Sequence, residues 1–169
     1  MIILGLLAGC SDSSPVAPKP TPTSVQQLNK KITNVIATNE SMTSIHVRHA
    51  GYEEEITAFA FATDILHIVQ GARRHNLLPS SEKIRFLVYV PFSDKYGNPS
   101  LQPVLGFIFR VEDLKKINFS EGVFTEFNLL DLSAETWRRE DLRYSQNAIQ
   151  AFCRKYRAHS HRFCGRESF

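Results

Sequence analysis

Two cysteines and two histidines near the C-terminus have residue types and a spacing that could do chemistry. Cys153, His159, His161 and Cys164 form a C-x5-H-x-H-x2-C cluster. Thiolate and imidazole groups are ligands that zinc accepts in a tetrahedral site, although this spacing matches no established zinc-finger pattern. The same two cysteines could instead form a disulfide, which persists only in an oxidising compartment. The compartment of the protein therefore decides between a metal site and a covalent cross-link.

The third cysteine, Cys10, ends an apolar segment at the start of the chain. Residues 1–7 read MIILGLL, and Leu7-Ala8-Gly9-Cys10 completes the segment. It resembles the signal peptide and lipobox of bacterial lipoproteins, in which signal peptidase II cuts before the cysteine. One departure from the usual pattern is that no Lys or Arg precedes the apolar run. The resemblance implies that residues 1–9 are a signal peptide and that Cys10 becomes a lipid-bearing N-terminus with fatty acyl chains.

The lipobox resemblance also implies a location. Ser11 follows the cysteine, where an Asp would imply the inner membrane, so the resemblance implies the outer membrane and its periplasmic leaflet. The apolar run is far shorter than the roughly 20 residues that a spanning helix needs, whereas two or more acyl chains anchor a protein stably. In the oxidising periplasm, Cys153 and Cys164 remain as an even pair. The resemblance therefore implies a Cys153–Cys164 disulfide, worth about 3 kcal/mol in the chain-entropy model, with the zinc site as the alternative.

Residues 10–24 follow as a proline-rich stretch. Residues 11–24 read SDSSPVAPKPTPTS, with four prolines among small polar side chains. Such a composition cannot bury enough apolar surface to fold and favours extended polyproline II. At about 3.1 Å per residue, the stretch could hold a domain on the order of 40 Å from a membrane. We expect a tether here.

Residues 25–169 are of a size typical of one globular domain. The formal charge of the chain is only +3, but residues 138–169 carry eight Lys or Arg against three Asp or Glu. This basic C-terminal region could contact an acidic protein or anionic lipid head groups. Trp137, Arg138 and Arg139 are candidate partner-binding residues, because Trp and Arg are favoured at interface hot spots. Tyr96, in the turn-rich segment 94–98, is a further candidate. We expect neither a cofactor nor a nucleic-acid partner.

Hydrophobic periodicity predicts the elements that must position these residues. Residues 84–92 are apolar at nearly every position, residues 103–111 alternate, and the turn chemistry between them predicts a hairpin. A further strand is expected over 43–49. Helices are expected over 25–38, over 53–75, from a Ser120 cap through Leu130, and over 141–157, with a strand at 56–62 as the alternative within the second. This order predicts an α+β fold: a small antiparallel sheet packed by two to four helices in a single domain.

Familiar catalytic motifs are absent from the sequence. It contains no G-x-S-x-G, H-E-x-x-H, P-loop or G-x-G-x-x-G pattern, and we assign no catalytic residue. We expect a non-enzymatic, protein-binding accessory module of an envelope system, similar in kind to pilotins and to surface-exclusion lipoproteins. Two alternatives remain open: an envelope hydrolase that acts on cell-wall or lipid material, and a binder of anionic surfaces through the basic tail.

Overall fold

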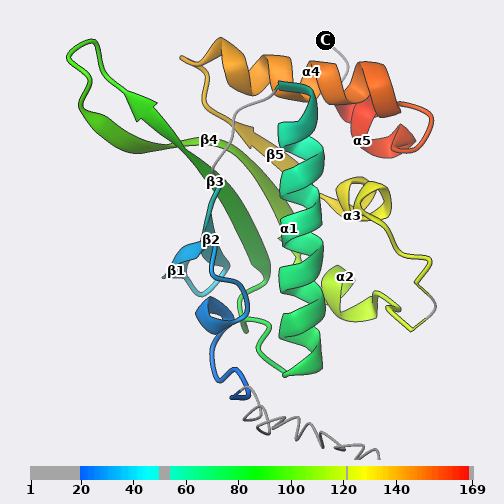
Figure 1. Ribbon diagram of the computed structural model, residues 1–169. Helices are drawn as coiled ribbons and strands as arrows, with labels where there is room; N and C mark the ends of the chain where they lie inside the picture. The colour runs from blue at the N-terminus through cyan, green and yellow to red at the C-terminus, as the bar shows by residue number, and fades with distance from the viewer. Residues whose placement is uncertain (1–19, 50–53, 121, 168–169) are drawn as a thin grey trace, which may run out of the picture.

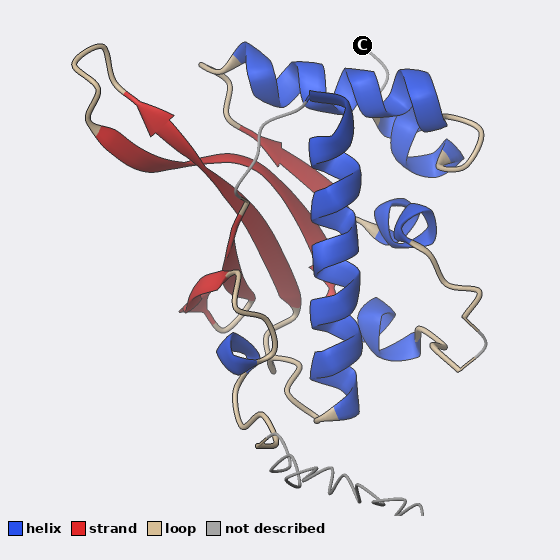
Figure 2. Cartoon of the chain, in the orientation of Figure 1, coloured by secondary structure: helices blue, strands red, loops and turns tan. Residues whose placement is uncertain are grey.

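A five-stranded sheet, ordered β1-β2-β3-β4-β5, forms one layer of the molecule. The computed structural model describes residues 20–49, 54–120 and 122–167. The long helix α1 crosses one face of the sheet, α3 and α4 pack against it, and α5 packs against α3 (Figure 1). No helix of the described residues covers the opposite face (Figure 2). The elements are η1 Val25–Gln27, β1 Ile32–Asn39, β2 Met42–Arg48, α1 Glu54–Arg74, β3 Lys83–Ser93, β4 Pro99–Arg110, α2 Val111–Lys116, α3 Glu126–Leu132, β5 Glu135–Arg138, α4 Arg143–Tyr156 and α5 His161–Arg166.

The predicted α+β class is confirmed, and the sheet is mixed where an antiparallel one was expected. β3 and β4 pair antiparallel, as expected for the predicted hairpin. β1 with β2 and β4 with β5 also pair antiparallel, but β1 and β5 were not predicted as strands. β2 and β3 are parallel. The difference follows from α1, because this helical crossover carries the chain back to the end of the sheet at which β2 began, so β3 runs in the same direction as β2.

The core lies between α1 and the inner face of the sheet. In β3, Ile84, Phe86, Val88 and Val90 alternate toward α1, and each is at most 1% exposed. Phe107 of β4 stacks on Phe61 of α1 with ring centroids 5.5 Å apart. Aromatic pairs of this kind add to the stability gained by burying apolar area. The alternation also sends the intervening residues of each strand to the outer face.

The long helix predicted over 53–75 is confirmed, and the alternative strand at 56–62 is wrong. The residues of α1 that pack deepest recur at helical spacing and include three alanines: Ala58, Phe61, Ala62, Ile65, Ile68, Val69 and Ala72. Two larger residues of the helix, Phe59 and Leu66, are only half-buried. Alanines on the contact face let the helix approach the sheet closely, so the larger residues beside them are displaced to its flanks.

Several other predicted elements are also confirmed. The strand expected over 43–49 is β2, the hairpin is β3–β4, and the last long helix is α4. The helix expected over 25–38 is wrong: only η1 is helical there, and β1 follows it. The β-branched side chains of β1 pair with β2, so a tertiary contact overrides a helical pattern. Three short elements, α2, β5 and α5, were not predicted.

The helix expected to start at Ser120 begins later. α3 starts at Glu126, after Thr125, whose backbone N–H and hydroxyl both donate to the Asn128 side-chain oxygen. Ser120 instead donates through its backbone N–H and hydroxyl to Asn118. Side chains of this type compete for local backbone groups, so either position could cap a helix. Within the described ranges, no helix has both the length and the apolar character that crossing a bilayer requires. The segments assigned to the signal peptide, to Cys10 and to most of the tether lie outside the described residues.

Gly106 of β4 marks a close approach on the outer face. It lies opposite Leu87 of β3 and Trp137 of β5. A Cβ atom at this position would lie 2.7 Å from the Leu87 Cδ2 and 2.8 Å from the Phe86 carbonyl oxygen. The Leu87 side chain could adopt another rotamer, but the Phe86 carbonyl oxygen is part of the strand backbone and cannot move without disturbing the sheet. Only glycine therefore fits between these neighbours.

We expect Gly106→Ala to destabilise the protein by about 1–3 kcal/mol, the usual cost of overpacking. The measurement is the free energy of unfolding in urea. Gly165→Ala is the matched control, because a Cβ atom there meets nothing within 4 Å. If the two variants were equally stable, the close approach at Gly106 would not constrain the sheet.

Candidate functional site

A hollow lies beside the last strand of the sheet. It has a volume of about 560 Å³ and is lined by Thr136, Trp137, Arg138, Glu140 and Gln146. Three of these residues come from β5, and Gln146 comes from the first turn of α4. We call this feature the β5 hollow. It contains two of the residues expected from sequence to bind a partner.

Strand alternation sends the side chains of β5 in opposite directions. Trp137 lies opposite Gly106 on the outer face of the sheet, whereas Arg138 lies opposite Leu105, whose side chain is in the core. The Arg138 guanidinium approaches the Glu167 carboxylate at 3.4 Å, and the Glu167 side chain is only 8% exposed. Arg138 therefore connects β5 to the C-terminal end of the described chain, and Trp137, half-exposed, is the side chain offered to a partner.

Arg139 forms a clasp between the loop after β5 and the β3–β4 hairpin. Its Nη1 donates to the Gln102 Oε1 at 2.6 Å, and its Nε and Nη2 donate to the two carboxylate oxygens of Asp141 at 2.8 and 2.9 Å. These charge-assisted bonds raise the pKa of Arg139 and lower the pKa of Asp141. We call this contact the Arg139 clasp. It holds the β5 hollow against the base of the hairpin.

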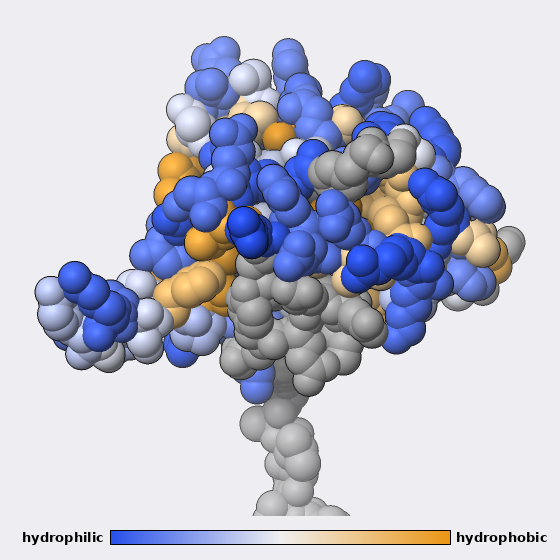
Figure 3. All heavy atoms as spheres, turned by 90° about the horizontal axis from the view of Figure 1, so that it is seen from above, coloured by the Kyte–Doolittle hydropathy of each residue, from blue (hydrophilic) through white to orange (hydrophobic). Residues whose placement is uncertain are grey.

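The outer part of that hairpin, residues 91–103, projects from the body of the molecule, and we call it the hairpin arm (Figure 1). Pairing between β2 and β3 ends at Tyr89, and β5 reaches only Leu105 of β4. Seen from above, the arm extends to one side, and hydrophobic residues gather where it leaves the body (Figure 3). Three prolines lie along its strands, at positions 91, 99 and 103. Prolines on an exposed edge hinder pairing with a foreign strand.

The tip of the hairpin arm is ordered by Asp94. Its Oδ1 accepts the backbone N–H groups of Tyr96 and Asn98 at 2.8 and 2.9 Å, and its Oδ2 accepts the Asn98 side-chain amide at 2.9 Å. These bonds, led by the one from the Asn98 side chain, lower the pKa of Asp94. Gly97 takes the left-handed φ of +84° that the turn needs. The result is a fixed loop that presents Tyr96, which is 76% exposed.

The β5 hollow, the Arg139 clasp and the hairpin arm form one continuous feature, which we call the arm–hollow surface. Trp137, Arg138, Arg139 and Tyr96 were predicted from the sequence. Gln102, which was not predicted, ties Arg139 to the hairpin arm. Gln102 could be found only through the pairing of β4 with β5. The signal for β5 was present, because Thr136 and Trp137 are good strand formers, but four residues are too few for a period to be recognised.

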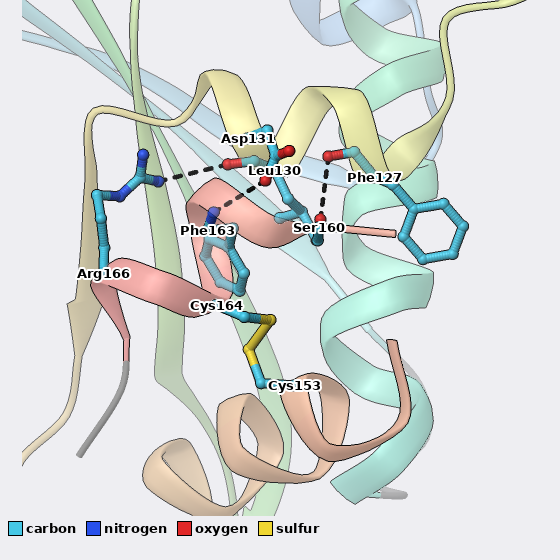
Figure 4. Close-up of a disulfide and its surroundings, with 8 residues drawn as sticks. All are labelled: Phe127, Leu130, Asp131, Cys153, Ser160, Phe163, Cys164 and Arg166. Carbon is cyan, nitrogen blue, oxygen red and sulfur yellow. Dashed lines mark hydrogen bonds between the residues drawn. A yellow bond between two sulfur atoms is a disulfide. The ribbon is translucent and has the colours of Figure 1, made fainter. Parts of the chain in front are cut away.

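The cysteine–histidine cluster is a cross-link. Cys153 and Cys164 form a disulfide with their Cα atoms 5.4 Å apart, and it joins α4 to α5 (Figure 4). His159 lies against the Phe127 ring with centroids 5.1 Å apart. No three His, Cys, Asp or Glu side chains are grouped as metal ligands in the part of the chain that the structure describes. Both thiols are used in the disulfide, so the alternative zinc site at Cys153, His159, His161 and Cys164 is not assembled.

Polar contacts fix the C-terminal segment around this disulfide. The Phe163 backbone N–H donates to the Asp131 carboxylate at 2.8 Å, and the Ser160 hydroxyl donates to the Phe127 carbonyl at 3.1 Å (Figure 4). The Phe163 ring is fully buried and packs edge-on against Phe107 of the sheet. The disulfide therefore secures a segment that completes the hydrophobic core.

An Asp–His–Lys cluster joins Asp64 of α1 to Lys31, just before β1, and to His49, just after β2; Asp64 is largely buried and Lys31 is partly exposed. Both oxygens of Asp64 accept bonds from Lys31 Nζ at 2.8 Å, and His49 Nδ1 lies 3.9 Å from Asp64 Oδ2. Burial and the nearby Lys31 lower the pKa of His49. An Asp–His pair can serve general-base catalysis, but this distance exceeds a hydrogen bond. Lys31 donates to both oxygens of the Asp64 carboxylate, so that carboxylate is held by an ion pair. The Lys31–Asp64 ion pair therefore has a structural role: it joins α1 to the start of β1.

Comparison of the chain with protein-family models, with curated proteins and with solved structures finds no match. No relative therefore assigns a role to any of these residues. What the arm–hollow surface can do follows from its chemistry. An exposed aromatic ring on a fixed loop, a half-exposed Trp and hydrogen-bonding groups beside a hollow are features that favour protein–protein contact.

We expect reduction of the Cys153–Cys164 disulfide to lower the free energy of unfolding by about 3 kcal/mol, because it closes a loop between α4 and α5. Urea unfolding with and without dithiothreitol measures this loss. A Cys153→Ser, Cys164→Ser double variant should be as unstable as the reduced protein and insensitive to the reductant. Equal stability of oxidised and reduced protein would contradict a stabilising role.

Proposed function

We propose that this chain is a bacterial lipoprotein, anchored by Cys10 in the outer membrane and facing the periplasm, whose domain binds another protein of an envelope assembly. The assembly is of the secretion, conjugation or exclusion type. The domain acts as an accessory module, and the binding region is the arm–hollow surface. The lipobox and the proline-rich tether support the anchor, and the geometry of the hairpin arm supports the binding role.

The observation that carries the binding role is the hairpin arm with its fixed tip. Asp94 holds the tip loop through three hydrogen bonds, so little conformational freedom is lost when a partner engages Tyr96. The ammonium group of Lys95 lies 4.9 Å from the centre of the Tyr96 ring. A rigid aromatic side chain beside a cation is well suited to enter a pocket on a partner. At the other end of the same surface, Trp137 supplies a second aromatic contact.

The orientation of the domain fits attachment through its N-terminal side. η1, the first element of the described chain, lies at the end of α1 opposite to α4, whereas the hairpin arm lies near the α4 end (Figure 1). A tether that enters at η1 leaves the arm–hollow surface on the side away from the anchor. With a tether reaching on the order of 40 Å, the domain could meet a partner in the periplasm while it remains attached to the membrane.

We expect Tyr96→Ala and Trp137→Ala each to lower recovery of the partner by about tenfold, because truncation of a hot-spot aromatic residue costs about 1.4 kcal/mol or more. The measurement is chemical crosslinking in intact cells of the source bacterium, followed by affinity purification and quantitative mass spectrometry. Arg138 is left unchanged, because its ion pair with the buried Glu167 makes it part of the fold.

His67→Ala is the matched control, because His67 is exposed on α1, away from the arm–hollow surface. It should leave recovery of the same partner unchanged. Far-ultraviolet circular dichroism and urea unfolding show whether each variant keeps its fold. If recovery were the same for all three folded variants, the arm–hollow surface would not be the binding region.

The lipid anchor has a separate test. Cells that express the full chain and are fed a clickable fatty-acid analogue should incorporate the label into the protein, because the lipobox resemblance makes Cys10 the acceptor of acyl chains. Cys10→Ala should lose the label and release the protein from the membrane fraction. An unlabelled native protein would refute the anchor. The binding role would still be tested by the Tyr96 and Trp137 variants.

A further inference from the structure

β1 is an edge strand whose own residues carry none of the usual blocks to pairing, and the short η1 packs beside its first residues. Its eight residues, ITNVIATN, include no proline and no charged side chain. The other free edges of the sheet are protected: the hairpin arm carries prolines, and β5 has only four residues, two of them charged. Natural proteins block exposed edges in these ways because unpaired backbone groups recruit other strands. The contrast indicates that β1 is kept available for pairing.

Two backbone groups of β1, on the side away from β2, form hydrogen bonds with side chains of the same chain. The Val35 N–H donates to the side-chain oxygen of its neighbour Asn34 at 2.9 Å. The Gln26 side-chain amide lies 3.5 Å from the Thr33 carbonyl oxygen. Residues 34–37 pair with β2 in regular register, and the irregularities lie at the two ends of the strand. The centre of β1 thus has the regular backbone that pairing with another strand requires. Near it, the Asn34 and Gln26 side chains form hydrogen bonds that the backbone of an added strand could form instead.

We propose that β1 pairs antiparallel with β1 of a second copy of this chain, with Val35 opposite Val35 on the two-fold axis. In this register, Lys30 and Glu40 each lie five residues from Val35, in the turns that flank β1. The turn that carries Lys30 in one copy therefore comes next to the turn that carries Glu40 in the other, at both ends of the pair. Both side chains are exposed, and neither has an ion-pair partner among the described residues.

The register also satisfies the backbone and the two faces of the sheet. Val35 directs its N–H away from β2, so a Val35–Val35 pair exchanges hydrogen bonds, as a two-fold antiparallel ladder requires. Residues opposite one another in such a ladder share a face. The half-buried Val35 side chains would therefore meet on the helix-covered side, and the 40%-exposed Ile36 would lie beside Asn34 of the other copy on the outer side. A continuous sheet would then run through both domains.

Charge complementarity favours a second copy over a foreign strand. Antiparallel self-pairing brings the basic end of β1 against its acidic end twice, whereas a foreign peptide would need an acidic residue opposite Lys30 and a basic one opposite Glu40. The inference is independent of the proposed binding role, because β1 lies at the opposite edge of the sheet from β5. Loss of partner recovery through Tyr96 or Trp137 would leave it unaffected.

The test uses sedimentation equilibrium of the full chain carrying Cys10→Ser, so that neither a lipid nor a thiol at that position can join copies. At low salt and concentrations up to about 1 mM, the mass should rise from 19.2 kDa toward twice that value. Lys30→Glu or Glu40→Lys alone places two like-charge pairs in the dimer and should weaken dimerisation by about tenfold. The double variant should restore it.

Two further variants separate this pairing from other causes. Lys95→Glu at the tip of the hairpin arm makes the same change in net charge as Lys30→Glu and should leave the dimer unchanged. Val35→Pro removes the outward N–H and should abolish dimerisation. If this variant fails to fold, the Lys30 and Glu40 charge-reversal variants still test the proposal. A mass of 19.2 kDa at every concentration, or a double variant as weak as the single ones, would overturn the proposal. A chain that stays monomeric and takes up a foreign strand at β1 would overturn it as well.

Discussion

Burial of one sheet face under α1 is the constraint on which the rest of the structure depends. Three alanines bring the helix close to the sheet, and Phe61 of α1 stacks on Phe107 at the centre of the contact. Because α1 is also the crossover between β2 and β3, the same packing makes those strands parallel and sets the order of the sheet. Every β-strand side chain is thereby assigned either to the core or to the outer face.

The C-terminal segment completes this core from the side. Phe163 of α5 packs against both Phe107 and Phe152, and the disulfide fixes α5 to α4. The cross-link and the core are therefore one unit. The basic residues of this region lie on the outer surface of that unit, while the exposed aromatic residues lie on the hairpin arm and β5.

Long elements with strong periodicity could be predicted from the sequence, and short elements could not. The hairpin of β3 and β4 and the helices α1 and α4 follow from apolar patterns that extend over many residues. β1 was read as helix because Ile32, Val35 and Ile36 also fit a helical spacing, and only pairing with β2 decides between the two. The Cys153–Cys164 disulfide could be inferred from the lipobox resemblance. The Arg139–Gln102 contact could not, because its partners are brought together by β5, an element with too few residues to predict.

The Arg139 clasp has a mechanical consequence for the hairpin arm. A two-stranded ribbon that projects beyond its sheet is held at the base alone, and it would bend and twist there if only the strand ladder supported it. By tying Gln102 to the loop before α4, the clasp converts the ribbon into a lever with a second support. A pull on the arm tip would then be transmitted to α4, and through the disulfide to α5, as a load shared by the whole C-terminal half. In this way the domain would bear tension between the proposed membrane tether at one end and the proposed protein partner at the other.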